Sequence, residues 1–336
     1  MKIAVLGAGT WGIALAKLLS ENGHEVTVWS AVQSELDSLS LTSKHKNLPD
    51  VVIPQNISYE SSLEKALAAK GAVLFSVASA YIRSTARLAA PFISENQLLI
   101  NASKGLEGGT LFTMTEVIGD ELKKYSSCPL PCLVALSGPT HAEEVAQNIP
   151  TCVVSACPDE EKASLAAELF MNSCMRVYTN TDILGVEICG AFKNIIALAA
   201  GMVKGMGYGD NTCAMLMTRG IAEMTRMGLA MGCKRRTFMG LAGIGDLIVT
   251  CTSRHSRNNR CGELIGSGMS YEDAAKEIGM VVEGYHALDA ATELCRKYGV
   301  SMPIVFAVYD VIKNGADPKE TAYRLMTRAR KSELDI

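Results

Sequence analysis

The sequence predicts an α/β protein in which a doubly wound, parallel-sheet domain precedes an all-helical domain. Three observations lead to this fold class: a glycine-rich turn between a strand and a helix near the N-terminus, strands that alternate with helices through the first half, and few β-branched runs in the second half. The chain has 336 residues. A single hydrophobic core usually stops growing at roughly 250–300 residues, so two domains are expected.

The N-terminal segment has the pattern of a β-α-β unit. Residues 3–6 are a short apolar run, which is typical of a strand buried on both faces. Apolar side chains then recur at helical spacing over residues 11–22, and Gly23 ends this helix. Residues 25–30 are β-branched and aromatic, which predicts the second strand.

Strands and helices continue to alternate through the rest of the first half. Further strands are predicted at residues 72–77, 98–101, 133–136 and 151–155, and helical stretches at 62–69 and 111–122. This alternation implies a parallel sheet with helices on both faces. We therefore assign residues 1–184 to a Rossmann-type, dinucleotide-binding domain.

The pattern changes near Gly185, after which helix-forming residues dominate. Helices are predicted at residues 185–206, 213–231, 270–278, 285–298 and 303–314, separated by Gly, Ser and Asn. We therefore assign residues 185–336 to an all-helical substrate and catalytic domain. Its apolar, glycine-rich helices favour a homodimer.

Charge and hydropathy exclude several classes of partner. The net charge is −3 and the pI about 6.0, without a long run of Lys or Arg, so neither nucleic acid nor an anionic membrane surface is expected to bind. The apolar run after Lys2 is interrupted by glycines, and no cleavage pattern follows it, so it is not a signal peptide. The most apolar segment, residues 195–203, is far shorter than the roughly 20 residues of a membrane span. The chain is expected to be soluble.

The eleven cysteines are irregularly spaced and form no C-x-x-C pair. An odd number without regular spacing resembles neither a disulfide framework nor a zinc site, so no metal is expected. Most lie in apolar company, as Cys152 and Cys189 do, where cysteine acts as a small buried hydrophobe. The pattern indicates reduced thiols in a cytoplasmic enzyme.

The segment from Gly7 to Gly12 reads GAGTWG and matches the G-x-G-x-x-G pattern. Alone the pattern is weak, because a tight turn without a ligand has the same glycines. Here it follows a predicted buried strand, opens a helix and precedes a second strand, which is the context of a dinucleotide site. Gly7 allows the tight turn, Gly9 lets the pyrophosphate approach the backbone, and Gly12 lets helix and strand pack closely. The helix N-terminus then attracts the phosphates.

The position that distinguishes NAD from NADP gives no clear answer. An acid about 20 residues past the loop would bind the ribose 2′-hydroxyl of NAD, and a nearby Arg would favour the 2′-phosphate of NADP. The second strand is followed by Ser30 and Ala31, and the first acid, Glu35, lies in the next helix, too far along for this role. Lys44 and Lys46 are the nearest cations. Both cofactors remain possible from the sequence.

Hydride transfer at an alcohol carbon needs a group that exchanges the hydroxyl proton and an anchor for the rest of the substrate. Four segments offer such groups, each with a simpler structural explanation. Lys104 follows a strand and equally fits an ordinary loop lysine. Residues 137–140 also follow a strand, Lys193 with Asn194 lies in an apolar helix, and the basic cluster 254–260 equally fits a solvated turn.

Lys193 is the strongest of these candidates. Its helical neighbours are apolar, and lysine is almost never fully buried without a partner. Burial would lower its pKa toward the range useful for proton transfer. Asp246, flanked by glycines in another apolar stretch, is the expected partner.

Six segments match one family in order along nearly the whole chain. They are GAGTWG at 7–12, SKGLE at 103–107, SGPTHAEE at 137–144, GAFKNIIALAAG at 190–201, GIGDLIVTCTSRHSRN at 243–258 and VVEG at 281–284. Together they resemble the bacterial NAD(P)-dependent glycerol-3-phosphate dehydrogenases. Six matching segments in the same order are far more specific than any single motif.

The resemblance implies a reaction: interconversion of dihydroxyacetone phosphate and sn-glycerol 3-phosphate with NAD or NADP, which supplies glycerol phosphate for phospholipid synthesis. Lys193 matches the proton acceptor of the family and would return the proton to the carbonyl oxygen in the reductive direction. Asp246 matches a substrate-site acid able to orient Lys193. Lys104 matches a lysine near both substrate and cofactor.

The resemblance also implies ligand-binding positions. Residues 256–258 match the segment that receives the substrate, and a basic, donor-rich loop suits a phosphate. The implied substrate-binding residues are Lys104, Gly138, Thr140, Asp246, Ser256, Arg257 and Asn258. The implied cofactor-binding residues are Gly7, Gly9, Thr10, Trp11, Gly12, Ala31, Lys104, Ala142, Arg257, Val281 and Glu283.

The chain departs from the family pattern at two places. Members often read VPS where this chain has residues 77–79 as VAS, although the expected Arg83 is present. Many members carry His or Arg at the position of Ala31, so the usual partner of a 2′-phosphate is absent.

Two other functions remain as alternatives. One is a reductase of another small hydroxy acid on the same two-domain plan, for which the Ser256–Asn258 segment would bind a carboxylate. The other is a dinucleotide-binding sensor that has lost catalysis. The presence of both Lys193 and Asp246 argues against the sensor.

Overall fold

A computed structural model describes residues 1–125, 132–330 and 332–333. The chain divides into two compact units. The sheet unit comprises Met1–Ser103 and Met114–Ile183, and the helical unit comprises Lys104–Thr113 and Leu184–Ile336. The segment Lys104–Thr113 therefore belongs to the helical unit, although it lies within the range 1–184 that the sequence assigns to the first domain.

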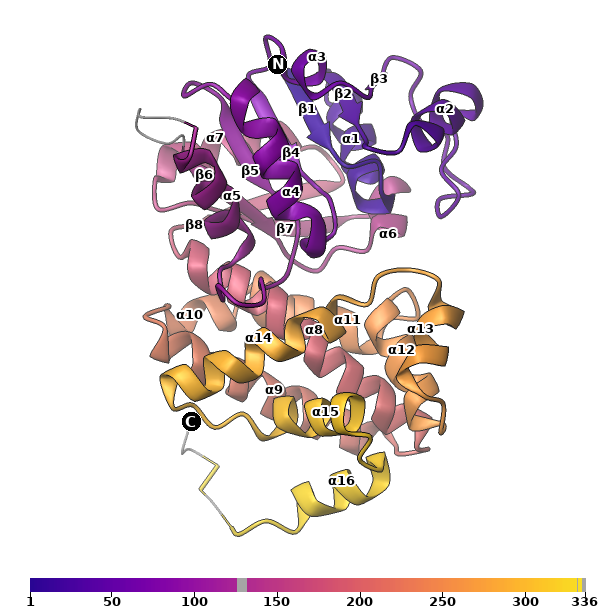
Figure 1. Ribbon diagram of the computed structural model, residues 1–336, viewed down its shortest axis with the longest axis vertical. Coiled ribbons are helices and arrows are strands. Elements are labelled where there is room, and N and C mark those ends of the chain that lie inside the picture. The colour runs from indigo at the N-terminus through magenta and orange to yellow at the C-terminus, as the bar shows by residue number, and fades with distance from the viewer. Residues whose placement is uncertain (126–131, 331, 334–336) are drawn as a thin grey trace. The chain divides into compact units, whose positions relative to one another are not determined.

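The sheet unit contains one sheet of eight strands in the order β3-β2-β1-β4-β5-β6-β7-β8 (Figure 1). Every neighbouring pair is parallel except β6 and β7. The strands are β1 Lys2–Leu6, β2 Glu25–Trp29, β3 Ser58–Glu60, β4 Ala72–Phe75, β5 Leu98–Asn101, β6 Leu133–Ser137, β7 Thr151–Ala156 and β8 Met175–Asn180. The strand order reverses at β1, between β2 and β4. Ligands of doubly wound sheets bind at the carboxyl ends of strands at such a point.

The helices of the sheet unit form two groups, in which α1 contacts α6 and α7, while α4 contacts α3 and α5. Right-handed crossovers on either side of the reversal place these groups on opposite faces of the sheet. The helices are α1 Thr10–Glu21, α2 Gln33–Thr42, α3 Leu63–Leu67, α4 Ser79–Ala89, η1 Ala90–Phe92, α5 Met114–Lys123, α6 Ala142–Ala146 and α7 Glu160–Phe170. The predicted α/β fold class is confirmed.

The second half of the sheet differs from the expected parallel series. The connection between β6 and β7 holds only the five-residue helix α6, and antiparallel neighbours need a shorter connection than parallel ones. Strand β8 was not predicted. Its side chains alternate, with Met175 and Val177 buried and Arg176 and Tyr178 exposed, as suits the edge of a sheet. This polar alternation differs from the buried apolar runs that marked the central strands.

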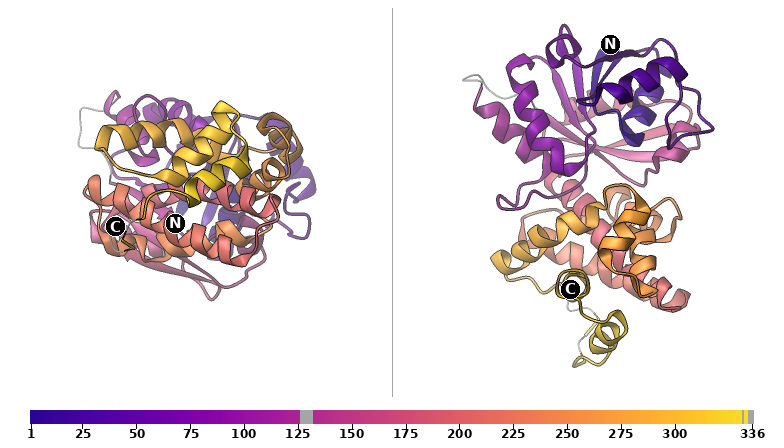
Figure 2. Two further views of the ribbon diagram at one scale, coloured as in Figure 1. Left: turned by 90° about the horizontal axis from the view of Figure 1, so that it is seen from below. Right: turned by 45° about the vertical axis from the view of Figure 1, so that its right-hand side comes forward.

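The helical unit surrounds the long helix α8 (Figure 1). Its helices are α8 Ile183–Gly205, α9 Asp210–Ala230, α10 Arg235–Phe238, the short π-helix η2 Leu241–Gly245, α11 Asp246–Thr252, α12 Arg257–Gly266, α13 Tyr271–Ile278, α14 Glu283–Tyr298, α15 Pro303–Asn314 and α16 Pro318–Met326. Helix α16 packs against α15 at the end of this unit (Figure 2). No strand interrupts the described part of the chain after residue 184, which agrees with the all-helical prediction.

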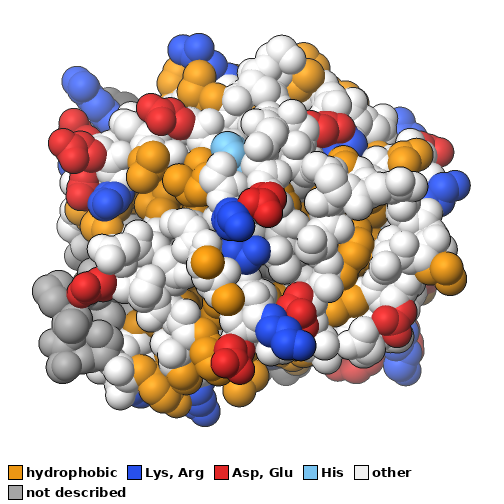
Figure 3. Space-filling model, turned by 90° about the horizontal axis from the view of Figure 1, so that it is seen from above, with side chains coloured by type: hydrophobic (Ala, Val, Ile, Leu, Met, Phe, Trp, Pro, Cys, Tyr) orange, Lys and Arg blue, Asp and Glu red, His pale blue; other side chains and the backbone are white. Residues whose placement is uncertain are grey.

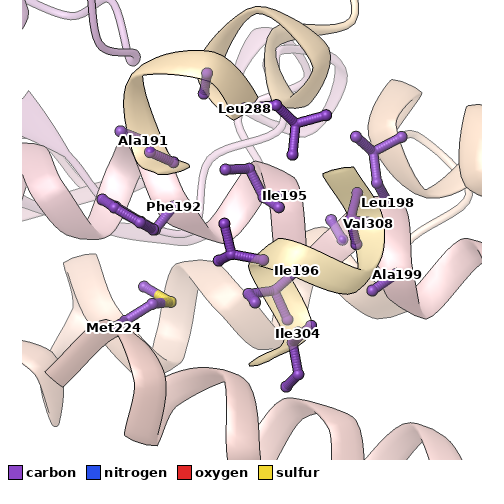
Figure 4. Close-up of a cluster of buried hydrophobic side chains, with 14 of the residues drawn as sticks. Ala191, Phe192, Ile195, Ile196, Leu198, Ala199, Met224, Leu288, Ile304 and Val308 are labelled. Carbon is purple, nitrogen blue, oxygen red and sulfur yellow. The ribbon is translucent and has the colours of Figure 1, made fainter. Parts of the chain in front are cut away.

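Apolar side chains of α8 form the centre of the core of the helical unit. Phe192, Ile195 and Ile196 are fully buried and lie among Met224 of α9 and Leu288 of α14 (Figure 4). By length and composition α8 resembles a membrane-spanning helix, yet 89% of its most apolar window is buried inside the protein. Its hydropathy is therefore that of a core helix.

Helices α8 and α12 pack with their backbones in contact. A Cβ atom at Gly201 would overlap the carbonyl oxygen of Asn259, and one at Gly262 would overlap that of Leu198. The same relation holds one turn further on, where Gly266 lies against Met202. Glycine is required at these crossings because any side chain would push the two helices apart.

The segment Lys104–Thr113 forms a small loop closed by a β-bridge between Leu106 and Thr113. Leu106 and Leu111 are buried in the core of the helical unit. Leu111 has a φ of +63°, which no α-helix contains. The helix predicted at residues 111–122 therefore begins only at Met114.

The remaining sequence expectations concern thiols and charge. The ten described cysteines are free thiols, and Cys128 lies outside the described residues. On the face shown in Figure 3, charged side chains of both signs are scattered among hydrophobic and uncharged ones. This distribution agrees with the small net charge of the chain.

Candidate active site

The glycine loop follows β1 and is tied to the end of β2. The backbone N–H of Gly7 donates to the carbonyl of Trp29 at 2.8 Å. Gly7 has a φ of +121°, and a Cβ there would lie 2.7 Å from the carbonyl oxygen of Ser76. Only glycine can make this turn from β1 to α1 so close to the residue that follows β4.

The two other glycines of the loop have different surroundings. A Cβ at Gly12 would overlap the carbonyl oxygen of Gly7, so this glycine closes the packing of α1 on the loop. A Cβ at Gly9 would meet nothing within 4 Å. The open space lies at the N-terminus of α1, where backbone N–H groups and the helix dipole favour an anion.

A buried hydroxyl supports a ligand at this loop. Ser76 follows β4 directly, and its Oγ has no hydrogen-bond partner among the described residues. A Cβ at Gly12 would lie 3.4 Å from this Oγ, so the hydroxyl is beside the glycine loop. Buried polar groups are normally hydrogen-bonded, and an unpaired one beside an open glycine cradle fits the phosphates of a dinucleotide. The residues present therefore fit the implied cofactor.

Matched substitutions should separate cofactor binding from folding at this loop. Gly9→Ala is expected to fold with an unchanged melting temperature, because its Cβ points into open space, but to weaken NADH binding about tenfold or more by blocking the pyrophosphate. Gly12→Ala is expected to lower the melting temperature, because its Cβ overlaps the backbone of Gly7. Calorimetric titration and thermal denaturation measure the two effects. Full NADH affinity in Gly9→Ala would contradict the cofactor assignment.

Thr10 and Trp11 open α1, and Ala31 lies exposed after β2. A second loop reaches the glycine loop here, since the Asn47 Nδ2 donates to the Thr10 Oγ1 at 2.9 Å. Glu35 is closer to the end of β2 than the sequence suggests, because the Ser30 hydroxyl donates to its Oε2 at 2.8 Å. Glu35 lies in the first turn of α2, as the sequence suggests, but this hydrogen bond holds its carboxylate near the end of the strand.

In the helical unit, three of the predicted residues meet at one buried carboxylate. The Lys193 Nζ of α8 donates to the Asp246 Oδ1 at 2.5 Å, and the Lys104 Nζ donates to the Oδ2 at 2.7 Å. Asp246 is 1% exposed, at the first position of α11. The Lys193 ammonium also donates to the Thr250 Oγ1 at 2.8 Å. We call Lys104, Lys193, Asp246 and Thr250 the lysine–aspartate cluster.

The electrostatics of the lysine–aspartate cluster favour an exchangeable proton on Lys193. Burial lowers the pKa of Lys193 to about 8, against the charge of Asp246, which raises it. Burial alone would raise the pKa of Asp246, but the charges of Lys104 and Lys193 outweigh it and hold that pKa below its usual value. At neutral pH the cluster is thus an ionised carboxylate between two ammonium groups, one of which releases its proton near physiological pH.

The segment around Ser256 is fixed to the same unit. Ser256 caps α12 by accepting from the backbone N–H of Asn259 at 3.2 Å. Asn258 links two helices, because its Nδ2 donates to Asn194 of α8 at 3.0 Å and its Oδ1 accepts from the backbone N–H of Gly284 of α14 at 2.9 Å. Arg257, at the first position of α12, is only partly buried.

The other predicted positions lie at the ends of elements. Gly138 follows β6 with a φ of +156°, and Thr140 donates to its carbonyl at 3.2 Å. Ala142 begins α6 of the sheet unit. Val281 and Glu283, in the helical unit, flank the start of α14 and are partly buried.

Sequence reasoning missed several residues of the site. Thr250 lies one helical turn after Asp246, a spacing that would have indicated it. Asn194 was noted beside Lys193, but its pairing with Asn258 depends on two helices that are distant in sequence. Gly190 supports the Lys104 side chain, whose Cγ would lie 3.3 Å from a Cβ there. No sequence signal indicated Ser76.

A large cavity elsewhere in the helical unit, about 930 Å³, is lined by residues such as Arg219, Glu223 and Arg226. None of the residues predicted to bind substrate or cofactor lines it. Burial raises the pKa of Glu223 to about 7, against the backbone N–H of Ile304, which donates to the carboxylate. Glu223 thus holds the N-terminus of α15, and the cavity is not part of the candidate site.

A doubly wound sheet with an open glycine cradle, joined to a helical unit that carries a buried lysine–aspartate cluster, defines the class of dinucleotide-dependent dehydrogenases. Family models agree: residues 2–163 match the N-terminal part and residues 182–323 the C-terminal part of NAD-dependent glycerol-3-phosphate dehydrogenase. The chain belongs to the NAD-dependent glycerol-3-phosphate dehydrogenase family. The resemblance expected from the sequence is confirmed.

Individual relatives cover the whole chain. A glycerol-3-phosphate dehydrogenase (NAD(P)+) of Lactobacillus delbrueckii subsp. bulgaricus is 56% identical over 99% of both chains. The enzyme of the same name from Pelotomaculum thermopropionicum is 46% identical over 99% of this chain and 95% of the relative. The crystal structure of the glycerol-3-phosphate dehydrogenase of Coxiella burnetii superposes with a TM-score of 0.92 at 34% identity, covering 97% of this chain and 99% of the other. The predicted cofactor, NAD or NADP, is confirmed at this level of detail.

Proposed function

We propose that this chain reduces dihydroxyacetone phosphate to sn-glycerol 3-phosphate, and catalyses the reverse reaction, by direct hydride transfer. NADH or NADPH, when bound, supplies the hydride that adds to the carbonyl carbon. The observation that carries the proposal is the buried Lys193 ammonium on Asp246, because a carbonyl that receives a hydride needs a proton donor at its oxygen.

In the proposed mechanism Lys193 donates its proton to the carbonyl oxygen as the hydride arrives at carbon. Asp246 keeps the ammonium charged in its buried position and, with Thr250, fixes the direction of the Nζ–H bonds. Lys104 is a second cation on the same carboxylate, and we assign it to the substrate oxygens. The neutral Lys193 amine accepts the proton in the reverse direction.

We assign the substrate phosphate to the start of α12. Arg257 supplies the charge, and the N-terminal turn of that helix supplies backbone donors. Ser256 and Asn258 fix this segment through their hydrogen bonds to Asn259, Asn194 and Gly284. We also propose that Gly138 and Thr140 contact the substrate.

We assign the dinucleotide to the sheet unit, with its pyrophosphate at the glycine loop. The open Cβ direction of Gly9 and the unpaired Oγ of Ser76 support this assignment. The proposed cofactor contacts are Gly7, Gly9, Thr10, Trp11, Gly12, Ala31, Lys104, Ala142, Arg257, Val281 and Glu283. We propose residues 1–184 as the cofactor-binding domain and residues 185–336 as the substrate-binding and catalytic domain.

The experiment that tests the function follows NADH or NADPH oxidation by the purified protein with dihydroxyacetone phosphate, and in parallel with small 2-keto acids. Turnover of dihydroxyacetone phosphate alone is expected. Turnover of a keto acid alone would favour the hydroxy-acid reductase, and cofactor binding without turnover of any substrate would favour the sensor.

The reductive reaction should depend on pH through Lys193. The proton donor is active in its charged form, which exists below the pKa of about 8 that burial imposes. We therefore expect kcat/KM for dihydroxyacetone phosphate to be constant below this pKa and to fall about tenfold per pH unit above it, while oxidation of glycerol 3-phosphate rises over the same range. A reductive profile that stays flat to about pH 10 would remove Lys193 from the role of proton donor, because that is near its unperturbed pKa.

We further propose a cytoplasmic location, in which the product supplies phospholipid synthesis, and a homodimer in solution. The free thiols of the described cysteines support a reducing compartment. Sedimentation of the purified protein measures the oligomeric state, and a monomer at micromolar concentration would exclude the stable dimer.

A further inference from the structure

The carboxyl end of β2 carries a fixed acid. Ser30, which follows the strand, is 5% exposed and accepts from the backbone N–H of Val32 at 3.1 Å. Its hydroxyl donates to the Glu35 Oε2 at 2.8 Å, so the carboxylate is drawn back from the first turn of α2 toward the strand end. The Glu35 side chain is otherwise exposed to solvent.

This acid is next to the glycine loop. Leu6 pairs with Trp29 in the sheet, and Gly7 donates to the Trp29 carbonyl, so Ser30 and Gly7 leave the same edge side by side. From the other side, burial lowers the pKa of His45, while the Glu35 charge and the Ala8 carbonyl both act on the imidazole to raise that pKa, so all three groups lie close together. Glu35, His45 and the glycine loop therefore form one rim within the sheet unit.

The position of this rim defines which part of a dinucleotide it meets. In β-α-β sites the adenosine ribose lies beyond the pyrophosphate, at the carboxyl end of the second strand. A carboxylate there accepts hydrogen bonds from the ribose 2′- and 3′-hydroxyls of NADH and repels the 2′-phosphate of NADPH. Ala31 offers no cation for that phosphate.

We propose that Glu35, held by Ser30, selects NADH over NADPH in this chain. The inference rests on the proposed function only in placing the pyrophosphate at the glycine loop. One opposing charge is close, because Lys46 also acts on His45. Lys46 lies on the exposed loop after α2 and is not held by a neighbour as Glu35 is by Ser30, so the fixed acid should dominate.

Binding measurements without turnover test the selection. Calorimetric titrations of the wild-type protein with NADH and NADPH, and with the fragments 5′-AMP and 2′,5′-ADP, report on the ribose position alone. We expect the wild-type protein to bind NADH and 5′-AMP about tenfold or more tightly than their 2′-phosphorylated counterparts. Glu35→Gln should tighten NADPH and 2′,5′-ADP about tenfold and change NADH little.

Two further variants control the experiment. Asp37→Asn removes the same charge from α2, at a side chain bound to Gln33, and should leave the preference unchanged. Ser30→Ala keeps the Glu35 carboxylate but removes the hydroxyl that holds it. This variant should show a preference for NADH between those of the wild-type protein and Glu35→Gln. A wild-type preference for NADPH, or equal effects of Glu35→Gln on both cofactors, would overturn the inference. Failure of the wild-type protein to bind either cofactor would instead refute the glycine-loop assignment itself, and the inference with it.

Discussion

Lys193→Ala is expected to lower kcat for dihydroxyacetone phosphate reduction by about 10²–10⁴-fold, the range typical of a lost general acid. The substitution removes the buried ammonium that is proposed to donate its proton to the substrate oxygen. Binding of NADH, assigned to the sheet unit, should persist within about threefold of the wild-type affinity, a difference of less than 1 kcal/mol. Steady-state kinetics and calorimetric titration measure the two quantities.

The control for this variant lies on the same helix. Lys204 is exposed near the end of α8, where it pairs with Glu263 at 2.7 Å. Lys204→Ala removes the same charge and should leave kcat unchanged. The Lys193→Ala protein should still fold, because Asp246 keeps Lys104 as a partner. Thermal denaturation of the variant checks this. A folded Lys193→Ala protein with kcat within threefold of the wild type would refute the role.

The second large effect is on stability, at the crossing of α8 and α12. Gly262→Ala is expected to lower the free energy of unfolding by about 3 kcal/mol, because its Cβ overlaps the Leu198 carbonyl and neither backbone can move without opening the helix pair. For a unit of this size the melting temperature should fall by about 6–12 °C. Gly209→Ala is the matched control, since a Cβ at Gly209 meets nothing within 4 Å. Equal melting temperatures for the two variants would contradict the close crossing.

The sequence predicted the elements whose burial produces a regular pattern. Strands β4 and β5 are buried throughout, and β1 is buried after Lys2, so these strands form apolar runs in the sequence. Helix α8 could be identified from its length and composition. The edge strand β8 was not predicted, because half of its side chains face solvent and it forms no apolar run. The start of α5 at Met114 was not predicted, because the apolar Leu111 before it belongs to the core of the helical unit and not to the helix.

The candidate site was predictable where a charged residue lies among apolar neighbours in the sequence. Lys193 in an apolar helix is such a residue, and Asp246 in an apolar stretch is its counterpart. The pairing of Asn258 with Asn194 and the unpaired hydroxyl of Ser76 arise only when distant segments meet, so neither left a local pattern. The position of the Glu35 carboxylate was not predictable, because spacing along a helix does not show that a serine hydroxyl holds the carboxylate near the strand.

The loop Lys104–Thr113 has a consequence for synthesis of the chain. It emerges from the ribosome about 70 residues before Leu184, where the rest of its unit begins. At about 5–20 residues per second, its apolar side chains Leu106 and Leu111 stay uncovered for roughly 4–14 s before α8 begins to emerge. During that interval the nascent chain exposes a short apolar segment that a chaperone can bind. A fragment that begins at Leu184 would lack both this segment and the Lys104 ammonium.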